Sequence, residues 1–361
     1  MAPLRIGLVG PVPPPNGGMA LQARQLVELL RSEGLEVQLL ATNAPYRPSW
    51  IGAVPGLRAV FRLLPYLLSV WRLAGRVDVL HMLANSGWSW QLFAAPVVWI
   101  GYLRGTPVVI NYRGGEARAY FTRSFSRVRP TLSRAASVVV PSGYLEQVFR
   151  DFGVSAAVIP NIINLDRFHP PEVGHENPAF DVVVTRNLEA IYGIETAIRA
   201  VALLQEDIPA LRLRIAGSGP LRDELEALAQ HLKVADRVAF VGRLEPDDVA
   251  SLYRQASVFL NPALVDNMPN SVLEALASGL PVVSSNVGGV PFIVSHEQTA
   301  LLVEPGDERA AAEAIKRLYD SPALAQALSR AGLEQVSQFS WPCVRQQWLD
   351  HYGGLAGKTA A

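Results

Sequence analysis

A strand, loop, helix and strand in the second half of the chain constrain the fold more than any other feature. Residues 258–260 form a short apolar run, which is typical of a buried strand. A helix is predicted to begin at Asn270 or Ser271 and to end at Gly279, because glycine commonly ends helices. Residues 282–283 begin another apolar run. A helix between two such strands indicates an α/β protein with a parallel sheet.

Two acidic residues flank the start of this helix. Asp266 lies in the loop before it, Glu274 lies about one turn into it, and seven residues separate the two. The junction of loop and helix directs backbone N–H groups and the positive end of the helix dipole at one spot, where an anion such as a diphosphate would bind. The alternative is a plain strand–loop–helix connection with a solvated Glu274.

The spacing of Asp266 and Glu274 resembles the acidic-x7-acidic motif of retaining glycosyltransferases of family 4, which have the GT-B fold. In that family the second acid holds the ribose of a nucleotide-sugar, and the first lies beside the transferred sugar. The resemblance implies a catalytic role for Asp266, which stands where Glu is commoner, and a ribose-binding role for Glu274. It also implies that the residues between them hold the sugar and the diphosphate, namely Asn267, Met268, Pro269, Asn270 and Ser271.

Length and composition bound the class of protein. The 361 residues suffice for two α/β domains with large cores. Cys343 is the only cysteine, which excludes an internal disulfide and a cysteine metal site and fits a reducing compartment. No apolar run reaches the roughly 18 residues that a membrane-spanning helix needs, and the first residues are typical of a strand rather than a signal peptide. A cytoplasmic location is therefore expected.

The zero net charge hides an asymmetry between the two halves. Residues 1–151 contain 16 Arg and 7 acidic residues, a net charge of +9, so residues 152–361 carry −9. A basic half indicates an anionic partner, which can be nucleic acid, an anionic membrane face or a lipid diphosphate. The Lys-poor, Trp- and Leu-rich context favours a membrane or lipid, and nucleic acid is not expected as a partner.

Residues 57–76 predict an amphipathic helix, which Pro65 is expected to break or kink. The side of this helix that faces away from its arginines is broadly apolar and includes Phe61 and Trp71. Such segments bind membrane surfaces, but a helix packed on the core with a solvated arginine stripe explains the pattern equally well. One narrow direction of this helix carries Arg58, Arg62, Arg72 and Arg76.

Further apolar runs predict a series of strands in the first half. Between the first strand and the next helix lies a Gly-rich loop, residues 10–20, which is the layout of a nucleotide-binding α/β half or simply a tight connection. The resemblance implies that Gly17 and Gly18 of this loop face the diphosphate and the acceptor. The predicted strands are residues 5–9, 37–40, 77–81, 107–112, 137–142 and 157–161.

Polar residues at two strand ends form a candidate acceptor side. Ligands of α/β proteins bind at the carboxyl ends of strands, where His81 ends one strand and Arg113, Gly114 and Glu116 follow another. Family members often carry a His at this strand end, opening toward the acceptor. A lone His is otherwise more often a structural residue.

The second half repeats the alternation after a linker, residues 164–178, with strands at 180–184, 211–216 and 238–241 and a helical segment at 305–338. In the family an Arg at the position of Arg186 grips the diphosphate. In the family a Lys assists this Arg in binding the diphosphate, but Tyr192 occupies the position of that Lys in this chain. The resemblance also implies donor contacts from Gly217 and Arg243, the latter where family members hold the base.

The sequence as a whole predicts two Rossmann-like domains that face each other across a cleft. Residues 1–165 would bind the acceptor, with a helix at 340–361 packing back on them, and residues 166–339 would bind the nucleotide-sugar. The implied function is a retaining transfer of sugar to a hydroxyl of a glycan, lipid-linked or small-molecule acceptor, in bacterial polysaccharide or glycolipid synthesis, peripherally on the inner membrane face.

Neither a metal nor another cofactor is expected. No Asp-x-Asp pair and no His-x-x-x-His pair occurs, so Arg186 and helix amides must stabilise the leaving diphosphate. A non-transferring protein on the same scaffold, such as an isomerase or a nucleotide-sugar-binding partner, is the alternative that fold alone does not exclude.

Overall fold

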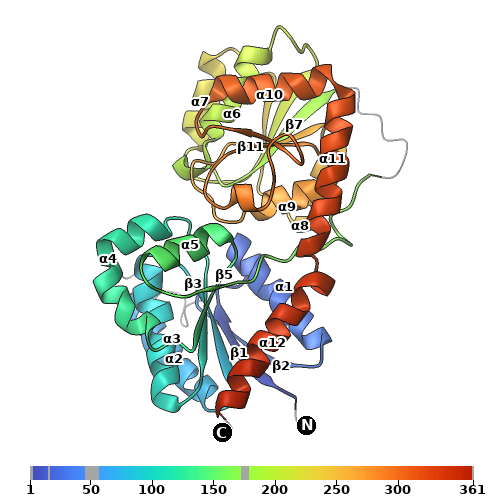
Figure 1. Cartoon of the computed structure of the whole chain (residues 1–361). Coiled ribbons are helices and arrows are strands. Elements are labelled where there is room, and N and C mark those ends of the chain that lie inside the picture. Colours follow the sequence, from blue (N-terminus) through green and yellow to red (C-terminus); the bar gives the residue numbers. More distant parts are fainter. Residues whose placement is uncertain (1–2, 15–16, 45–56, 172–178, 360–361) are drawn as a thin grey trace. The chain divides into compact units, whose positions relative to one another are not determined.

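A computed structural model of the protein describes residues 3–14, 17–44, 57–171 and 179–359. Contacts divide the chain into two compact units. The first contains Met1–Ile162 and Val344–Ala361, and the second contains Ile163–Cys343. Each unit is built on one six-stranded sheet with helices around it (Figure 1). The prediction of two Rossmann-like parallel sheets is confirmed.

The sheet of the first unit has the strand order β2-β1-β3-β4-β5-β6, and all of its pairs are parallel. Its strands are β1 (Arg5–Gly10), β2 (Glu36–Ala41), β3 (Val79–Ala84), β4 (Val108–Tyr112), β5 (Ser137–Val140) and β6 (Ala157–Val158). Its helices are α1 (Gly18–Ser32), α2 (Leu57–Ala74), the π-helix η2 (Trp90–Ala94), α3 (Ala95–Arg104), α4 (Ala117–Leu132), α5 (Gly143–Asp151) and most of α12 (Trp341–Thr359).

Alternation along β3 divides its side chains between two helical layers. Leu80 and Met82 join a core cluster with side chains from α2, α3, α4 and α5. His81, between them, points to the opposite face and contacts Trp348 and Tyr352 of α12. The predicted C-terminal helix therefore packs on the first unit.

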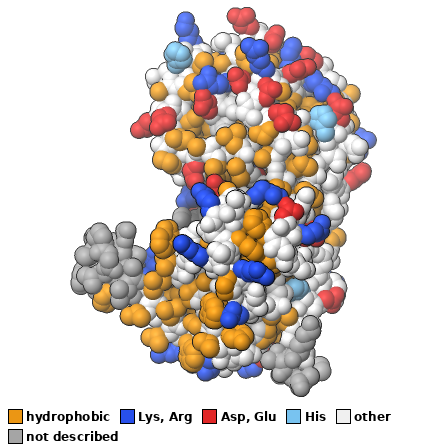
Figure 2. Space-filling view, turned by 60° about the vertical axis from the view of Figure 1, so that its left-hand side comes forward, with side chains coloured by type: hydrophobic (Ala, Val, Ile, Leu, Met, Phe, Trp, Pro, Cys, Tyr) orange, Lys and Arg blue, Asp and Glu red, His pale blue; other side chains and the backbone are white. Residues whose placement is uncertain are grey.

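Helix α2 is continuous through Pro65, so the chain does not break where the proline predicts it. Tyr66, Val70 and Leu73 are buried in the core and hold the helix on the sheet although Pro65 cannot donate a backbone hydrogen bond. The apolar face is wider than the core covers, because Leu64 stays exposed with other large hydrophobic side chains of the same helix. Figure 2 shows hydrophobic side chains gathered over this unit, with arginines between them.

The sheet of the second unit has the order β12-β11-β10-β7-β8-β9 and is also parallel. Its strands are β7 (Phe180–Thr185), β8 (Leu211–Ala216), β9 (Val238–Gly242), β10 (Val258–Asn261), β11 (Val282–Ser285) and β12 (Leu301–Val303). Its α-helices are α6 (Ile194–Leu204), α7 (Arg222–His231), α8 (Pro246–Gln255), α9 (Asn270–Ala277), α10 (Glu308–Asp320) and α11 (Pro322–Val336), with short 3-10 turns η3 (Ala190–Tyr192), η4 (Val290–Phe292) and η5 (Ser337–Phe339).

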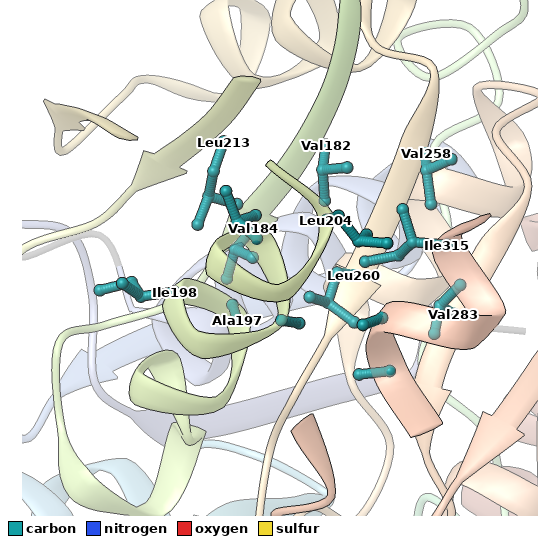
Figure 3. Close-up of a cluster of buried hydrophobic side chains, with 14 of the residues drawn as sticks. Val182, Val184, Ala197, Ile198, Leu204, Leu213, Val258, Leu260, Val283 and Ile315 are labelled. Atoms are coloured by element: carbon teal, nitrogen blue, oxygen red, sulfur yellow. The ribbon is translucent and has the colours of Figure 1, made fainter. Parts of the chain in front are cut away.

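Alternate residues of the central strands of this unit face two separate cores. Val182 and Val184 of β7 pack with Ile198 of α6 and Ile315 of α10 (Figure 3). Val183, which lies between the two valines, packs on the other face with side chains from α8 and α9. A period of two with both faces buried explains why these strands are apolar throughout.

The structure of the second unit differs from the sequence prediction in two places. The helical segment expected over 305–338 is two helices, because Pro322 has no N–H with which to continue α10. Ser321 instead caps α11, and its Oγ accepts a hydrogen bond of 3.3 Å from the amide of Leu324. Strand β12 was not predicted, since it is only three residues long. Part of the predicted linker, 172–178, lies outside the described residues.

Candidate active site

The predicted donor residues of the second unit converge at one edge of its sheet. Strand order reverses between β7 and β10, and the carboxyl ends of strands at such a reversal are where α/β proteins bind ligands. Arg186 directly follows β7, and Asn261 ends β10. The loop after β10 carries Asp266 and leads into α9 with Glu274.

Arg186 is held by three side chains. Its Nε and Nη2 atoms donate to Oδ1 of Asn261 at 3.1 and 3.0 Å, and Nη2 also forms an ion pair with Asp266. The guanidinium carbon lies 5.2 Å from the ring centroid of Tyr192. Both partners of the ion pair are 12% exposed. The guanidinium group is therefore oriented before any ligand binds.

Asn261 and Ser284 are site residues that the sequence did not reveal. Asn261 is fully buried, and its Nδ2 donates to Oγ of Ser284 at the end of β11, at 3.0 Å. The bond leaves Oδ1 of Asn261 facing Arg186. A polar residue at the end of a buried strand was the available signal. Its partner depends on which strands are neighbours, so the sequence did not show it.

Asp266 is fixed by its own loop and by a second one. Its Oδ1 accepts a hydrogen bond of 2.9 Å from the amide of Asn267, and its backbone carbonyl accepts one of 3.1 Å from Gly289. At Gly288, where φ is +54°, a Cβ would lie 1.9 Å from the same carbonyl oxygen. Burial raises the pKa of Asp266 above its usual value, against the opposing effect of Arg186. Close backbone contact thus requires glycine at 288.

Glu274 faces the same edge from α9. Its Oε2 accepts a hydrogen bond of 3.3 Å from the hydroxyl of Tyr253, which is also hydrogen-bonded to Thr185. Burial raises the pKa of Glu274 to about 7. The carboxyl group therefore changes its protonation state near neutral pH.

The start of α9 has the features of an anion site. The helix begins at Asn270, no side chain caps it at Pro269, and its first turn contains no acidic residue. Oγ of Ser271 is buried and has no hydrogen-bond partner among the described residues. First-turn amides and the helix dipole give this end a positive potential, and buried hydroxyls are normally hydrogen-bonded. A phosphate oxygen would provide the missing hydrogen-bond partner of the Ser271 hydroxyl.

The other predicted donor residues of this unit lie in the segments that follow β8, β9 and β10. Asn267, Met268 and Pro269 are buried in the loop before α9. The amide of Gly217 donates to the carbonyl of Gly242 at 2.8 Å, and a Cβ at Gly217 would lie 1.9 Å from the carbonyl oxygen of Arg186. Gly217 therefore allows the segment after β8 to pack against the backbone of Arg186, which follows β7. Arg243 follows β9 and is exposed.

The first unit carries the remaining predicted site residues, namely Gly17 and Gly18, which were predicted to bind the donor, and the acceptor-side residues. Gly17 precedes α1 and Gly18 begins it, with open space where a Cβ of Gly17 would stand. Arg113 follows β4, and its Nη1 donates to Oδ1 of Asn161 at 2.5 Å, while burial lowers the pKa of Arg113 to about 10. Glu116 is exposed at the start of α4.

Gly114 lies among three polar side chains. A Cβ there would lie 2.6 Å from Oγ of Ser86, 2.7 Å from Oδ1 of Asn85 and 2.8 Å from the hydroxyl of Tyr112. Asn85 and Ser86 follow β3 and were not predicted as site residues. Asn85 and Ser86 lie near Gly114 because β3 and β4 are adjacent in the sheet.

His81 lies in the core of the first unit and is fully buried. Its Nδ1 lies 2.6 Å from the hydroxyl of Tyr352, and its Nε2 lies 3.1 Å from Nδ2 of Asn111. Burial lowers the pKa of His81 to about 3, so the ring is neutral at physiological pH. The predicted placement of His81 on the acceptor side is therefore corrected: the side chain anchors α12 to β3.

Within the described ranges, no group of three or more His, Cys, Asp or Glu side chains is arranged to hold a metal ion. Independence from metal remains a prediction.

Two family models match adjoining parts of the chain. The model described as Glycosyltransferase Family 4 matches residues 16–167, and the model described as Glycosyl transferases group 1 matches residues 167–335.

Several known proteins are similar to this chain. Phosphatidyl-myo-inositol mannosyltransferase of Mycobacterium leprae is 26% identical over 376 residues, which cover 98% of this chain and 97% of that protein. D-inositol 3-phosphate glycosyltransferase of Streptomyces avermitilis is 30% identical over 213 residues, which cover 54% of this chain. That match spans 46% of the relative, so it covers about half of its length.

Solved structures show the same architecture. Sucrose-phosphate synthase of Thermosynechococcus elongatus has a TM-score of 0.77 and 25% identity, with 98% of this chain and 100% of that chain covered. Anabaena HepE, solved in complex with UDP-glucose, has a TM-score of 0.75 and 16% identity, with 97% and 99% covered. These neighbours define the class as the GT-B fold. The chain belongs to the group 1 glycosyltransferases, family 4.

The pKa of Glu274 predicts a pH dependence of stability. Burial raises it from 4.5 to about 7, so the stability that this group contributes is complete below pH 4.5 and is lost as the pH rises through about 7. Glu274→Gln removes this titration. Between about pH 5 and pH 8 we expect the variant to lose less unfolding free energy than the parent, by on the order of 1–3 kcal/mol.

Urea denaturation at both pH values, followed by circular dichroism, measures the difference. Glu334→Gln, an exposed change on α11, is the matched control and should follow the parent. Parallel profiles for the parent and Glu274→Gln would contradict the raised pKa.

Proposed function

We propose that this protein is a retaining glycosyltransferase that moves a sugar from a nucleoside-diphosphate sugar to a hydroxyl of an acceptor. The observation that carries the proposal is the convergence of Arg186, Asp266 and Glu274 with the amino end of α9 at one reversal of strand order. This combination offers groups for a ribose, a diphosphate and a sugar within one site.

Each part of the donor has a proposed partner. The carboxylate of Glu274 accepts hydrogen bonds from two ribose hydroxyls, and the amides of α9 with Ser271 hold the diphosphate. Residues 267–270 border the sugar, whereas Gly217 and Arg243 lie beside the base, as the family resemblance implies. HepE was solved with UDP-glucose, so uridine diphosphate sugars are the first donors to test.

The proposed chemistry exchanges one bond at the anomeric carbon. The bond between that carbon and the leaving phosphate oxygen breaks, and a bond to the acceptor oxygen forms on the same face of the sugar. The acceptor proton passes to the leaving phosphate. Arg186 and the α9 amides stabilise the negative charge that grows on the phosphate, while Asp266 orients Arg186 and borders the sugar.

The proposed acceptor side is the end of the first sheet that carries Arg113, Gly114 and Glu116. Gly17 and Gly18 are proposed donor-binding residues, which would face both the diphosphate and the acceptor as the family resemblance implies. A glycan, a polyprenyl-linked glycan or a small molecule would present the hydroxyl, in bacterial polysaccharide or glycolipid synthesis on the cytoplasmic side. The names of two relatives point to inositol-containing acceptors, which belong in the first acceptor panel.

A two-stage assay tests the function. Thermal shift with UDP, GDP, ADP and TDP identifies the base, and nucleotide release is then measured with the matching sugars and an acceptor panel. A transferase releases nucleotide in proportion to glycosylated acceptor. A protein that binds the nucleotide-sugar without releasing nucleotide or forming a product would instead support the non-transferring alternative.

Replacement of Glu274 by Ala is expected to weaken nucleotide binding at least tenfold. Hydrogen bonds to a charged group contribute about 1.5–3 kcal/mol each, and the change removes two of them. Isothermal titration calorimetry with the preferred nucleoside diphosphate measures the effect at about pH 8, where Glu274 is ionised, with Glu334→Ala as the surface control. An unchanged dissociation constant would contradict the assignment of Glu274 to the ribose.

Arg186→Ala is expected to slow turnover by about 100-fold or more while it weakens nucleotide binding less than tenfold. The reason is that the charge on the leaving group grows in the transition state. Steady-state kinetics and calorimetry on the same variant separate the two effects. Arg199→Ala, which changes a partly exposed arginine of α6, is the matched control. Turnover of Arg186→Ala within about threefold of the parent would count against the assignment.

Transfer is also expected to continue in EDTA, because the charge of the leaving group is met by Arg186 and by helix amides. Protein dialysed against EDTA is compared with protein supplied with Mg²⁺ or Mn²⁺ in the nucleotide-release assay. Loss of activity in EDTA that either ion restores would overturn the metal-free mechanism.

A further inference from the structure

The outward face of α2 carries a row of large hydrophobic side chains. Phe61, Leu64, Leu68 and Trp71 are 49%, 57%, 56% and 43% exposed. Their spacing of three, four and three residues puts them on one side of the helix. The opposite side already anchors α2 in the core, so folding of the unit does not require the exposed row.

Helix α3 packs beside α2 and continues this surface. Trp99, Tyr102 and Leu103 are 36%, 58% and 69% exposed. We define the docking face as these three residues with Phe61, Leu64, Leu68 and Trp71 of α2. Soluble monomers rarely leave so many large apolar side chains together in water, and such patches mark binding sites.

Arginines are interleaved with the aromatic rings of the docking face. The guanidinium carbon of Arg104 lies 4.9 Å from the ring centroid of Trp71, and so links α3 to α2. That of Arg134 lies 4.0 Å from Trp99 and 5.5 Å from Tyr102. Tryptophan, tyrosine and arginine in such contact combine an apolar body with a polar or charged tip, which suits the boundary between lipid and water.

Negative charge is nearly absent from this part of the sequence. Residues 37–115 contain seven Arg and a single acid, Asp78, which is bound to Arg5 at 2.7 Å. A second copy of the chain would bring the same positive charges against each other. An anionic surface complements them. Among the described residues, no helix is long and apolar enough to cross a membrane.

We infer that the docking face binds the surface of an anionic phospholipid bilayer, with its leucines and aromatic rings inserted at the level of the headgroups. The inference stands apart from the proposed transfer reaction. The structure changes what the sequence predicts here: the side chains that insert are the exposed apolar row, and the arginines flank it. Arg62 is partly buried, whereas Arg72 and Arg76 are exposed.

Vesicle co-sedimentation tests the docking face. At low salt the parent protein is expected to pellet with vesicles of phosphatidylcholine and phosphatidylglycerol, and at least tenfold less with phosphatidylcholine alone or in roughly 0.5 M NaCl. The double change Leu64→Gln and Leu68→Gln is expected to lower the partition at least tenfold. Leu203→Gln, which alters a leucine 50% exposed on α6, is the control and should bind like the parent.

A second pair of variants tests the charge. Arg72→Gln with Arg76→Gln is expected to weaken anionic binding several-fold, whereas Arg309→Gln with Arg330→Gln in the second unit should not. All of these changes are at exposed positions, so every variant is expected to fold. Thermal melts by circular dichroism verify this.

Three results would overturn the inference. They are a parent protein that stays in the supernatant with anionic vesicles, equal partition of the double leucine variant and the parent, and equal binding to neutral and anionic vesicles. Sedimentation velocity adds a fourth: a dimer that the leucine changes dissociate would assign the docking face to a second copy.

Discussion

The ion pair between Arg186 and Asp266 is the interaction on which the candidate site depends. Both side chains are mostly buried, and removing charges from water costs several kcal/mol per ion unless they are paired and hydrogen-bonded. Asn261 supplies the further bonds that the guanidinium group needs. Well-packed apolar residues commonly stabilise a fold as well as such a pair does. The value of the pair therefore lies in the orientation it gives to Arg186.

Backbone contacts between loops make that orientation rigid. At Gly193, Gly217 and Gly288 a Cβ would lie 2.2, 1.9 and 1.9 Å from a carbonyl oxygen of another loop. The carbonyls belong to Pro262, Arg186 and Asp266, so every contact lies within or beside the ion-paired segments. Side chains on closely packed loops move little when a ligand arrives, and such preorganisation is what electrostatic stabilisation of a transition state requires.

Local patterns in the sequence predicted every strand except β12, the helix at 270 and the spacing of the two acids, because each depends on neighbouring residues. Features that depend on distant residues were missed. The bond from Asn261 to Ser284 exists because β10 and β11 are adjacent, and the buried place of His81 depends on α12, some 270 positions away in the chain. The width of the apolar face of α2 was visible in the sequence, but how much of it the core covers was not.

Charge balance links the two acids to the donor that the site is proposed to bind. One guanidinium group faces two carboxyl groups, so full ionisation would leave the site negative and oppose a diphosphate. Burial raises the pKa of both Asp266 and Glu274, the latter to about 7. Near neutral pH the second carboxyl is thus partly protonated, which reduces the negative charge that would oppose a diphosphate beside Arg186 and the positive end of α9. The same burial that makes the ion pair costly therefore makes the site receptive to an anion.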